Sequence, residues 1–421
     1  MRFWKLLPLV IFGGLFGGIS AQSLEVVPAR IMADEAAAIR ATGLEPNERV
    51  TIRAELTDGG AQGWASQADF VADAQGAVDA SKLAPVTGSY KAVSAMGLIW
   101  SMMPVTKKVS AYMATRNLGP QTVDFHLLRQ GKELANAHLE QVTLAAGVER
   151  FPVHEDGLCG TLFVPPGAGR HPAVLVVGGS EGGVPVRRAA WLASHGYAAL
   201  ALAYFRFEDL PPQLESIPLE YFQQALQWMA RRPEIGNARV AVMGGSLGGE
   251  LALQLGAMFP RICAVVAYVP ANVRIASCCR NNGGPAWTWE GRALSYMLPR
   301  LRGNPAAQAT AVIEAEYTKG PILMISGESD HIWNSWEMAD EVVSRLKGHH
   351  FAYSYENLKY PHAGHYAGRP DIMPAWHGEV RNPTSGREND PGGSPEGDAK
   401  SSIDSIPKVL EFLRKNLAGL Q

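Results

Sequence analysis

The sequence predicts two folded parts, an all-β sandwich followed by a domain built on a mostly parallel, doubly wound sheet. Two changes in pattern indicate this order. From about Leu24 to about Gly147, short segments of alternating polar and apolar residues are separated by turns, as in a sandwich. From about Val148 onward, apolar runs alternate with amphipathic segments, which is typical of repeated strand and helix units. A chain of 421 residues is long enough for both parts.

The first part shows its strand pattern most clearly from Val50 to Thr57, where every second residue is apolar. A period of two indicates a strand with one buried face. Asp58-Gly59-Gly60 then favours a turn, and a second strand is expected from Trp64 to Ala72. No group of residues in this part suggests catalysis.

The second part contains six expected strands and five expected helices. Two segments interrupt the rhythm: Ala271 to about Thr318 is interpreted as an insertion over the site, and Arg381 to Asp398 as a mobile surface loop. The expected strands are Ala173 to Val177, Ala198 to Tyr204, Val240 to Met243, Cys263 to Tyr268, Ile322 to Ile325 and Phe351 to Tyr355. The expected helices are Val186 to His195, Leu219 to Arg231, Leu251 to Met258, Ser335 to Leu346 and Ile406 to Leu417.

Residues 1–21 are predicted to be a secretory signal peptide. Arg2 and Lys5 precede an apolar run from Leu6 to Ile19, and the small residues Ser20-Ala21 follow. The run is shorter than the roughly 20 residues that span a bilayer, so an uncleaved membrane anchor is the alternative. We therefore expect an exported protein, periplasmic or secreted, with no stable membrane span after cleavage.

Composition and residue spacing argue against several functions. The 38 basic and 40 acidic side chains nearly cancel, which gives no general attraction to nucleic acid. Four cysteines are too few for a disulfide framework in this length, although export is compatible with one bridge. No cysteine or histidine spacing matches a metal site, so we expect neither a metal nor a cofactor. The oligomeric state stays open.

Ser246 is the candidate nucleophile. It stands in Gly244-Gly245-Ser246-Leu247-Gly248, which matches G-x-S-x-G, the sharp strand-to-helix turn that exposes a serine at the sheet edge of an α/β-hydrolase. An expected strand precedes the pentapeptide and an expected helix follows it, as the motif requires. Because the chain has 44 glycines, the motif could match by chance. The alternative is a glycine-rich turn whose serine has no catalytic role.

A serine nucleophile needs a base in hydrogen-bond reach and a carboxylate that orients the base. In an α/β-hydrolase the acid and then the histidine follow the serine along the chain. Asp330, just after an expected strand, is the candidate acid; Glu328 is its rival, and Asp340 falls within the next helix. The alternative is that Asp330 only caps that helix. His365, preceded by a glycine that lets its loop bend, is the candidate base, and His362 is its rival.

Two backbone N–H groups are expected to stabilise the oxyanion. One belongs to Leu247, and the other to the loop Gly178 to Gly183, where Ser180 is the first choice and Glu181 the rival. Such a loop also occurs in nucleotide sites. No G-K-[ST] follows it here, however, and Glu181 would repel phosphate, so nucleotide binding is disfavoured.

Several stretches are similar to the family of acyl-CoA thioesterases and bile acid-CoA:amino acid N-acyltransferases. The resemblance covers nearly all of the chain after the predicted signal peptide, and the combination is specific where no single stretch would be. In the first part, Gly88-Ser89-Tyr90 and Ala95 to Met102 resemble the family's G-S-F and P-M-G-L-L-W-S-M stretches. In the second, the similar stretches are Ala201 to Phe205, Glu208 to Pro211, Leu219 to Phe222, Gly327 to Trp333 and Gly364 to Tyr366.

The resemblance implies an immunoglobulin-like β-sandwich over residues 24–147 and an α/β-hydrolase domain over residues 148–421. It also implies a triad of Ser246, Asp330 and His365 that hydrolyses acyl-CoA-type thioesters to acid and thiol through an acyl-serine. Acyltransferase members use a cysteine nucleophile, so the serine favours release of the acyl group by water.

Two features depart from the family. Glu181 stands where the family has a small residue; it could disfavour an anionic substrate or simply sit at a helix N-terminus. Export would separate the enzyme from coenzyme A thioesters, which are cytosolic.

The predicted export therefore leaves an exported carboxylesterase or dienelactone-hydrolase-like esterase as an alternative function. An acyl-CoA:amino acid N-acyltransferase is a further alternative, and a non-catalytic binding protein is disfavoured by the complete triad. Arg187 and Arg188 are candidates for binding coenzyme A phosphates, or else form a solvated helix face.

Overall fold

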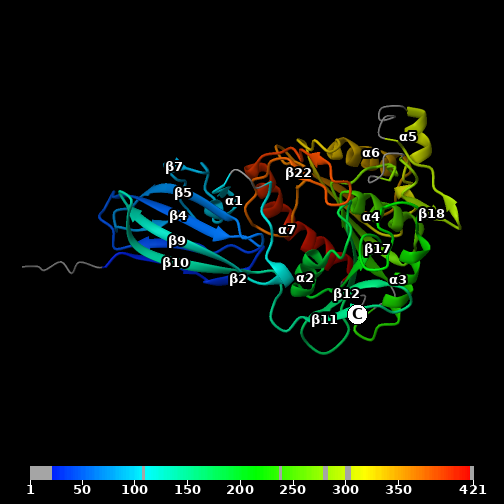
Figure 1. Ribbon diagram of the computed structural model, residues 1–421, viewed down its shortest axis with the longest axis horizontal. Helices are drawn as coiled ribbons and strands as arrows, with labels where there is room; N and C mark the ends of the chain where they lie inside the picture. The colour runs from blue at the N-terminus through cyan, green and yellow to red at the C-terminus, as the bar shows by residue number, and fades with distance from the viewer. Residues whose placement is uncertain (1–20, 107–109, 237–238, 278–282, 299–304, 418–421) are drawn as a thin grey trace, which may run out of the picture.

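The computed structural model describes residues 21–106, 110–236, 239–277, 283–298 and 305–417. A β-sandwich, drawn in blue and cyan in Figure 1, is followed by an α/β domain, drawn from green to red. The change of sheet falls between Val142 and Glu149. The expected signal peptide, apart from Ala21, lies outside the described residues, as do Cys278 and Cys279. Within the described ranges, no helix combines the length and apolarity that crossing a membrane requires.

Two sheets form the N-terminal sandwich. The larger has the order β2-β10-β9-β4-β5-β7, with β8 also paired to β5, and the smaller has the order β1-β3-β6. The expected alternation is present in β4, whose even-numbered residues are buried. Trp64, Phe70 and Phe125 are among the largest side chains of this core. The elements are β1 Ser23–Val27, β2 Arg30–Met32, β3 Ala38–Thr42, β4 Arg49–Thr57, β5 Gly63–Val71, β6 Val78–Asp79, β7 Thr87–Gly88, α1 Gly97–Trp100, β8 Met103–Pro104, β9 Gln121–Arg129 and β10 Lys132–Val142.

The α/β domain is built on an eight-stranded sheet with the order β11-β12-β14-β13-β16-β17-β20-β21. The first two pairings are antiparallel, and every pairing from β14 to β21 is parallel. The strands are β11 Glu149–Val153, β12 Cys159–Val164, β13 Ala173–Val177, β14 Ala198–Ala203, β16 Val240–Gly245, β17 Ile262–Tyr268, β20 Ile322–Gly327 and β21 Tyr355–Tyr360. The helices are α2 Val186–Ser194, α3 Glu220–Ala230, α4 Leu247–Met258, α5 Pro305–Ala311, α6 Ser335–Gly348 and α7 Pro395–Leu417.

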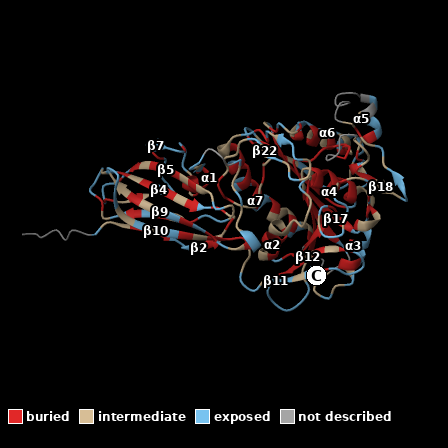
Figure 2. Cartoon of the chain, viewed as in Figure 1, coloured by how far each residue is buried: buried red, intermediate tan, exposed pale blue. Residues whose placement is uncertain are grey.

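Helices cover both faces of this sheet. In β13, Leu175 and Val177 join the core that contains α3, α4 and α6, whereas Val174 and Val176 join the core that contains α2 and α7. Figure 2 shows the central strands buried along their length. A strand buried on both faces has no polar side, which is why these strands read as continuous apolar runs in the sequence. The doubly wound α/β prediction is confirmed.

Four expectations for the second part differ from the structure, and the last of them concerns the insertion. The last strand begins at Tyr355, not Phe351, because the Phe351 N–H donates to the carbonyl of Leu346 and closes α6 instead of pairing in the sheet. The helix expected from Ile406 is the second half of α7. Its first four residues, Pro395 to Asp398, lie in the segment interpreted as a mobile loop, as does most of a short hairpin of β22 Val380–Arg381 with β23 Glu388–Asn389.

The insertion also differs from expectation. Of its described residues, only Ile275 lines the cavity at the candidate site. Others, including Val273, Trp287 and Ile313, pack into the core beside α4. Its short strands are β18 Trp287–Trp289, which pairs with β15 Ile217–Pro218, and β19 Arg292–Ala293.

A segment of the second domain, residues 371–378, lies against the sandwich and is called the strap below. Its amides donate to sandwich carbonyls, Ile372 to Ala33 at 2.7 Å and Ala375 to Trp100 at 3.0 Å. Gly378 donates to the carbonyl of Ser110 at 2.8 Å in the same way. The strap therefore joins the two domains through backbone hydrogen bonds.

Candidate active site

Ser246 sits on a sharp turn between β16 and α4, with φ +58° and ψ −126°. This conformation is unfavourable for a residue with a side chain, and the surrounding glycines allow it. A Cβ on Gly244 would stand 2.1 Å from the carbonyl oxygen of Gly248, and one on Gly248 would stand 2.4 Å from that of Gly178. Three backbone segments thus meet at the turn, and only glycine fits at these two contacts.

A chain of hydrogen bonds joins the three residues that the sequence singled out. His365 Nε2 lies 2.8 Å from Ser246 Oγ, and His365 Nδ1 lies 2.8 Å from Asp330 Oδ2. The three side chains follow β16, β21 and β20, all at the carboxyl edge of the sheet, where sites in such folds gather. Burial leaves the Asp330 carboxylate without solvent contact, and its Oδ1 also accepts the N–H of Ile332 at 2.9 Å.

The rival residues lie elsewhere. Glu328 is exposed, and Asp340 lies within α6, where it accepts hydrogen bonds from Asn357 and Lys359. The carbonyl of His362 accepts the N–H of Ser394, and its side chain is exposed.

Trp333 contacts the candidate base directly and was not foreseen from the sequence. Its ring meets that of His365 edge-on, with the centroids 5.0 Å apart. Its Nε1 donates to the carbonyl of Val269 at 3.1 Å, which fixes the orientation of the indole. The indole therefore limits how far the imidazole can turn away from Ser246.

The loop expected to complete the oxyanion site lies beside the nucleophile. A Cβ added to Gly179 would stand 3.3 Å from Ser246 Cβ. Leu247 begins α4, so its N–H has no acceptor within that helix. The Glu181 carboxylate turns back and accepts the N–H of Gly179 at 3.0 Å, so it is a partner of this loop. Ser180 lines the same cavity.

The hairpin of β22 and β23 holds this loop in place. The side chain of Asn382 donates to Ser180 Oγ at 2.8 Å, and Thr384 Oγ1 donates to the Ser180 carbonyl at 2.7 Å. Asn382 Oδ1 also accepts the N–H groups of Thr384 and Ser385, which fixes the turn itself. Contacts distant in sequence, which no local pattern reveals, order this segment.

A cavity of about 560 Å³ opens at Ser246. This volume lies within the roughly 300–1,000 Å³ typical of small-molecule sites. Apolar side chains, among them Leu247, Val269 and Trp333, form much of its wall. Its described charged lining comprises Glu181 and the four arginines Arg188, Arg369, Arg381 and Arg387, so the positive charges predominate.

The two adjacent arginines expected near this loop have different surroundings. Arg187 pairs with Asp371 of the strap at 2.9 Å and does not line the cavity. Arg188 lines it, with its guanidinium stacked on the ring of Tyr268.

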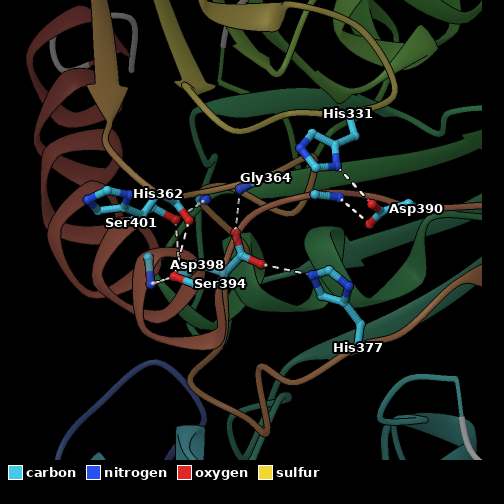
Figure 3. A network of polar contacts seen from close by, with 11 residues as sticks. His331, His362, Gly364, His377, Asp390, Ser394, Asp398 and Ser401 are labelled. Atoms are coloured by element: carbon cyan, nitrogen blue, oxygen red, sulfur yellow. Dashed lines mark hydrogen bonds and ion pairs between the residues drawn. The ribbon is translucent and has the colours of Figure 1, made fainter. Parts of the chain in front are cut away.

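Asp398 supports the loop that carries the candidate base. Its Oδ1 accepts the N–H of Gly364, the residue before His365, at 2.8 Å, and its Oδ2 lies 3.3 Å from His377 Nε2 (Figure 3). The His377 ring meets that of Tyr366, the residue after the base, with centroids 5.1 Å apart. This buried pair therefore contacts both neighbours of the candidate base, and His377 itself belongs to the strap.

Glu250 lies one turn beyond the nucleophile in α4 and is fully buried. Its Oε1 accepts the Nε1–H of Trp287 at 2.9 Å, and its Oε2 accepts the N–H of Ile275 at 3.2 Å. Burial raises the pKa of Glu250 to about 8, against an ordinary value of 4.5, because the charged form is poorly solvated there. At neutral pH this carboxyl is therefore mainly protonated.

The sheet order and the serine turn define the class of the protein, an α/β-hydrolase preceded by a β-sandwich. The acyl-CoA thioester hydrolase/BAAT N-terminal region model matches residues 34–155, and the BAAT/acyl-CoA thioester hydrolase C-terminal model matches residues 217–419. The chain belongs to this acyl-CoA thioester hydrolase/BAAT family.

Individual proteins show the same likeness over the whole length. The chain is 31% identical to acyl-coenzyme A thioesterase 6 of Mus musculus, over 95% of this chain and 98% of that protein. It is 30% identical to peroxisomal succinyl-coenzyme A thioesterase of Mus musculus, over the same shares. Among solved structures, a Mycobacterium tuberculosis puromycin-hydrolyzing peptidase aligns with 89% of this chain and 54% of its own, at 14% identity and a TM-score of 0.45.

Proposed function

We propose that the protein hydrolyses acyl thioesters of the coenzyme A type to a free acid and a thiol. The hydrogen-bonded chain from Ser246 through His365 to Asp330 is the observation that carries this proposal. Family membership and the thioesterases among the relatives support a thioester as the bond that is cleaved.

In the proposed first step, the Ser246 hydroxyl attacks the thioester carbonyl while its proton passes to His365 Nε2. Asp330 accepts a hydrogen bond from Nδ1–H and stabilises the imidazolium that forms. The N–H of Leu247, together with one from the loop that contains Ser180, is proposed to bind the oxyanion; one such donor is typically worth about 3–4 kcal/mol of barrier. The thiol leaves with the proton held on Nε2.

In the second step, water attacks the acyl-serine, and His365 again removes and returns a proton. Water is favoured over an amino acid as acceptor because the nucleophile is serine, whereas acyltransferase members of the family resemble this chain but use cysteine. The second candidate function is hydrolysis of oxygen esters, which the predicted export of the chain favours. That export is itself a proposal, tested by measuring whether the mature protein begins after about Ala21.

The test compares wild type with Ser246→Ala, using release of free thiol from acyl-CoA. We expect the variant to lose on the order of 10⁴ or more in kcat, as when a nucleophile is removed from a coupled triad. Ser344→Ala, on the exposed face of α6, is the matched control and keeps the wild-type rate. An undiminished rate in Ser246→Ala would refute the assignment.

Two further measurements separate the alternatives. A much higher kcat/KM for simple esters than for acyl-CoA would favour the esterase, and an acyl-glycine product on addition of glycine would favour acyl transfer. Failure of a fluorophosphonate probe to label Ser246 in the folded protein would favour a non-catalytic binding protein.

A further inference from the structure

A histidine, a cysteine and a glutamate gather near the antiparallel edge of the large sheet, outside the cavity at Ser246. His154 follows β11, Cys159 begins β12, and Glu208 lies in the loop after β14. Their donor atoms, an imidazole nitrogen, the thiol sulfur and a carboxylate oxygen, all lie within 4.8 Å of one another. None of the three, all of them described residues, lines that cavity, so the proposed reaction does not use them.

The fold holds the segments that carry these residues beside each other. Cys159 pairs in register with Ala203, the last residue of β14, so the loop that leads to Glu208 starts next to the thiol. The Tyr221 hydroxyl bridges the two strands, because it accepts the N–H of Cys159 at 3.1 Å and donates to the carbonyl of Ala203 at 2.7 Å. The backbone of the cluster is therefore in place without a ligand.

Hydrogen bonds also fix the turns on either side of the cluster. Trp228 Nε1, on α3, donates at 2.9 Å to the carboxylate of Glu155, the residue after His154. The loop that carries the glutamate is closed by the Arg206 N–H, which donates to the carbonyl of Pro211 at 2.7 Å. Closing the three donors onto one centre therefore requires movement of side chains and not of these turns.

The separation of the donors suits a single metal ion. His154 Nδ1 lies 3.2 Å from Glu208 Oε2. Nitrogen and oxygen ligands of one tetrahedral Zn²⁺, each about 2.0–2.1 Å from the metal, lie about 3.3 Å apart, so this pair is already close to the required separation. Both side chains are about half exposed and can rotate toward the sulfur of Cys159.

Charge and ligand type favour a cation of borderline softness. Asp209, the residue after Glu208, adds a second negative charge that acts on the Cys159 thiol. Among the described residues, no lysine or arginine forms an ion pair with Glu208 within 4.0 Å, and its partner is His154. Thiolate and imidazole ligands suit Zn²⁺, whereas Mg²⁺ and Ca²⁺ prefer oxygen ligands alone.

We propose that His154, Cys159 and Glu208 form a Zn²⁺ site with water as the fourth ligand. On binding, the S–H bond of Cys159 breaks, a Zn–S bond forms and the proton passes to solvent, while the metal keeps its oxidation state. The ion cross-links the turn between β11 and β12 to the loop after β14. Because Glu208 is distant in sequence from the other two ligands, spacing along the chain does not reveal this site.

The cross-linked loop also reaches the candidate active site. Arg206 Nη1 donates to the carbonyl of Glu181 at 2.9 Å, in the loop beside the nucleophile. The metal is thus assigned a structural role, in which it braces the support of that loop without touching the substrate.

The experiment measures Zn²⁺ binding to the full chain by calorimetry, after a chelator has removed any metal and with a phosphine reductant present. Wild type should bind one Zn²⁺, and Co²⁺ in its place should show the charge-transfer absorption of a Co–thiolate bond. His154→Ala and Cys159→Ala should each weaken binding by at least about 100-fold, beyond the 10- to 100-fold typical of a residue that only orients a ligand. Zn²⁺ should raise the Tm of wild type and leave that of His154→Ala unchanged.

Two controls test other sources of binding. His138→Ala removes an exposed histidine outside the cluster and should bind Zn²⁺ as wild type does. The double variant Cys278→Ser with Cys279→Ser removes two adjacent thiols and should do the same. If Cys159→Ala does not fold, His154→Ala decides the question, because its exposed side chain can be shortened without disturbing the core.

Three results would overturn the proposal. The first is a wild type that binds no Zn²⁺ and gives no thiolate absorption with Co²⁺. The second is full Zn²⁺ affinity in folded His154→Ala or Cys159→Ala. The third is loss of the metal in the Cys278 and Cys279 double variant, which would place the binding site there.

Discussion

The buried Glu250 allows a pH-dependent stability to be predicted from the structure. In the folded protein burial raises its pKa to about 8, whereas an exposed glutamate in the unfolded chain titrates near 4.5. Between these values the unfolded chain has lost the proton that the folded protein still holds. Raising the pH through this window therefore favours unfolding, and the penalty is complete above about pH 8.

The magnitude follows from about 1.4 kcal/mol per pKa unit. Between pH 5 and pH 8, Glu250 should lower the free energy of unfolding by about 3–4 kcal/mol. Glu250→Gln has nearly the shape of the protonated acid and does not titrate. The variant should therefore gain stability over wild type as the pH rises.

The assay is urea unfolding of both proteins at pH 5, 6, 7 and 8, followed by tryptophan fluorescence and far-ultraviolet circular dichroism. Each pH is compared within the pair, so that other titrating groups cancel. Exposed Glu356 provides the control, because Glu356→Gln makes the same chemical change at the surface of the protein. A constant difference for Glu250→Gln from pH 5 to pH 8 would refute the reasoning.

Three other predictions concern the site and the two cores. Asp330→Asn should fold normally yet lose on the order of 10³–10⁴ in kcat, because the imidazole loses the carboxylate that sets its tautomer; an unchanged kcat would contradict the proposed role. Gly244→Ala should leave little soluble protein, since its Cβ would stand 2.1 Å from a backbone oxygen, whereas Gly348→Ala, with no atom nearby, should express normally. Asp58→Ala should destabilise the sandwich by about 2–4 kcal/mol in urea unfolding, because it leaves the Trp64 Nε1–H and three backbone amides without their acceptor. An unchanged urea midpoint for Asp58→Ala would contradict this last prediction.

The central strands could be predicted because burial on both faces leaves a continuous apolar run in the sequence. Ala173 to Val177 coincides with β13 for this reason. The serine, the acid and the histidine could also be predicted in this chain order. Each follows a parallel strand, and the carboxyl ends of parallel strands meet at one edge of the sheet.

Segments fixed by distant contacts could not be predicted in this way. The residues around Asn382 are polar and rich in turn formers, which suggested mobility, but their hydrogen bonds to Ser180 bridge about 200 positions of the chain. The same limit applies to Arg188. Its sequence suits a solvated helix face as well as a ligand site, whereas the structure stacks its guanidinium on Tyr268 beside Gly245.

The strap has a consequence for dividing the chain. It belongs to the second domain in sequence, yet its amides are satisfied by carbonyls of the first, and its His377 reaches the aspartate behind the base loop. A shortened chain that begins at residue 148 would keep Ser246, Asp330 and His365 but lose the acceptors of three strap amides. We therefore expect the second domain to be less stable when it is expressed without the sandwich. Exchanging sandwiches between relatives would require the strap to be exchanged as well.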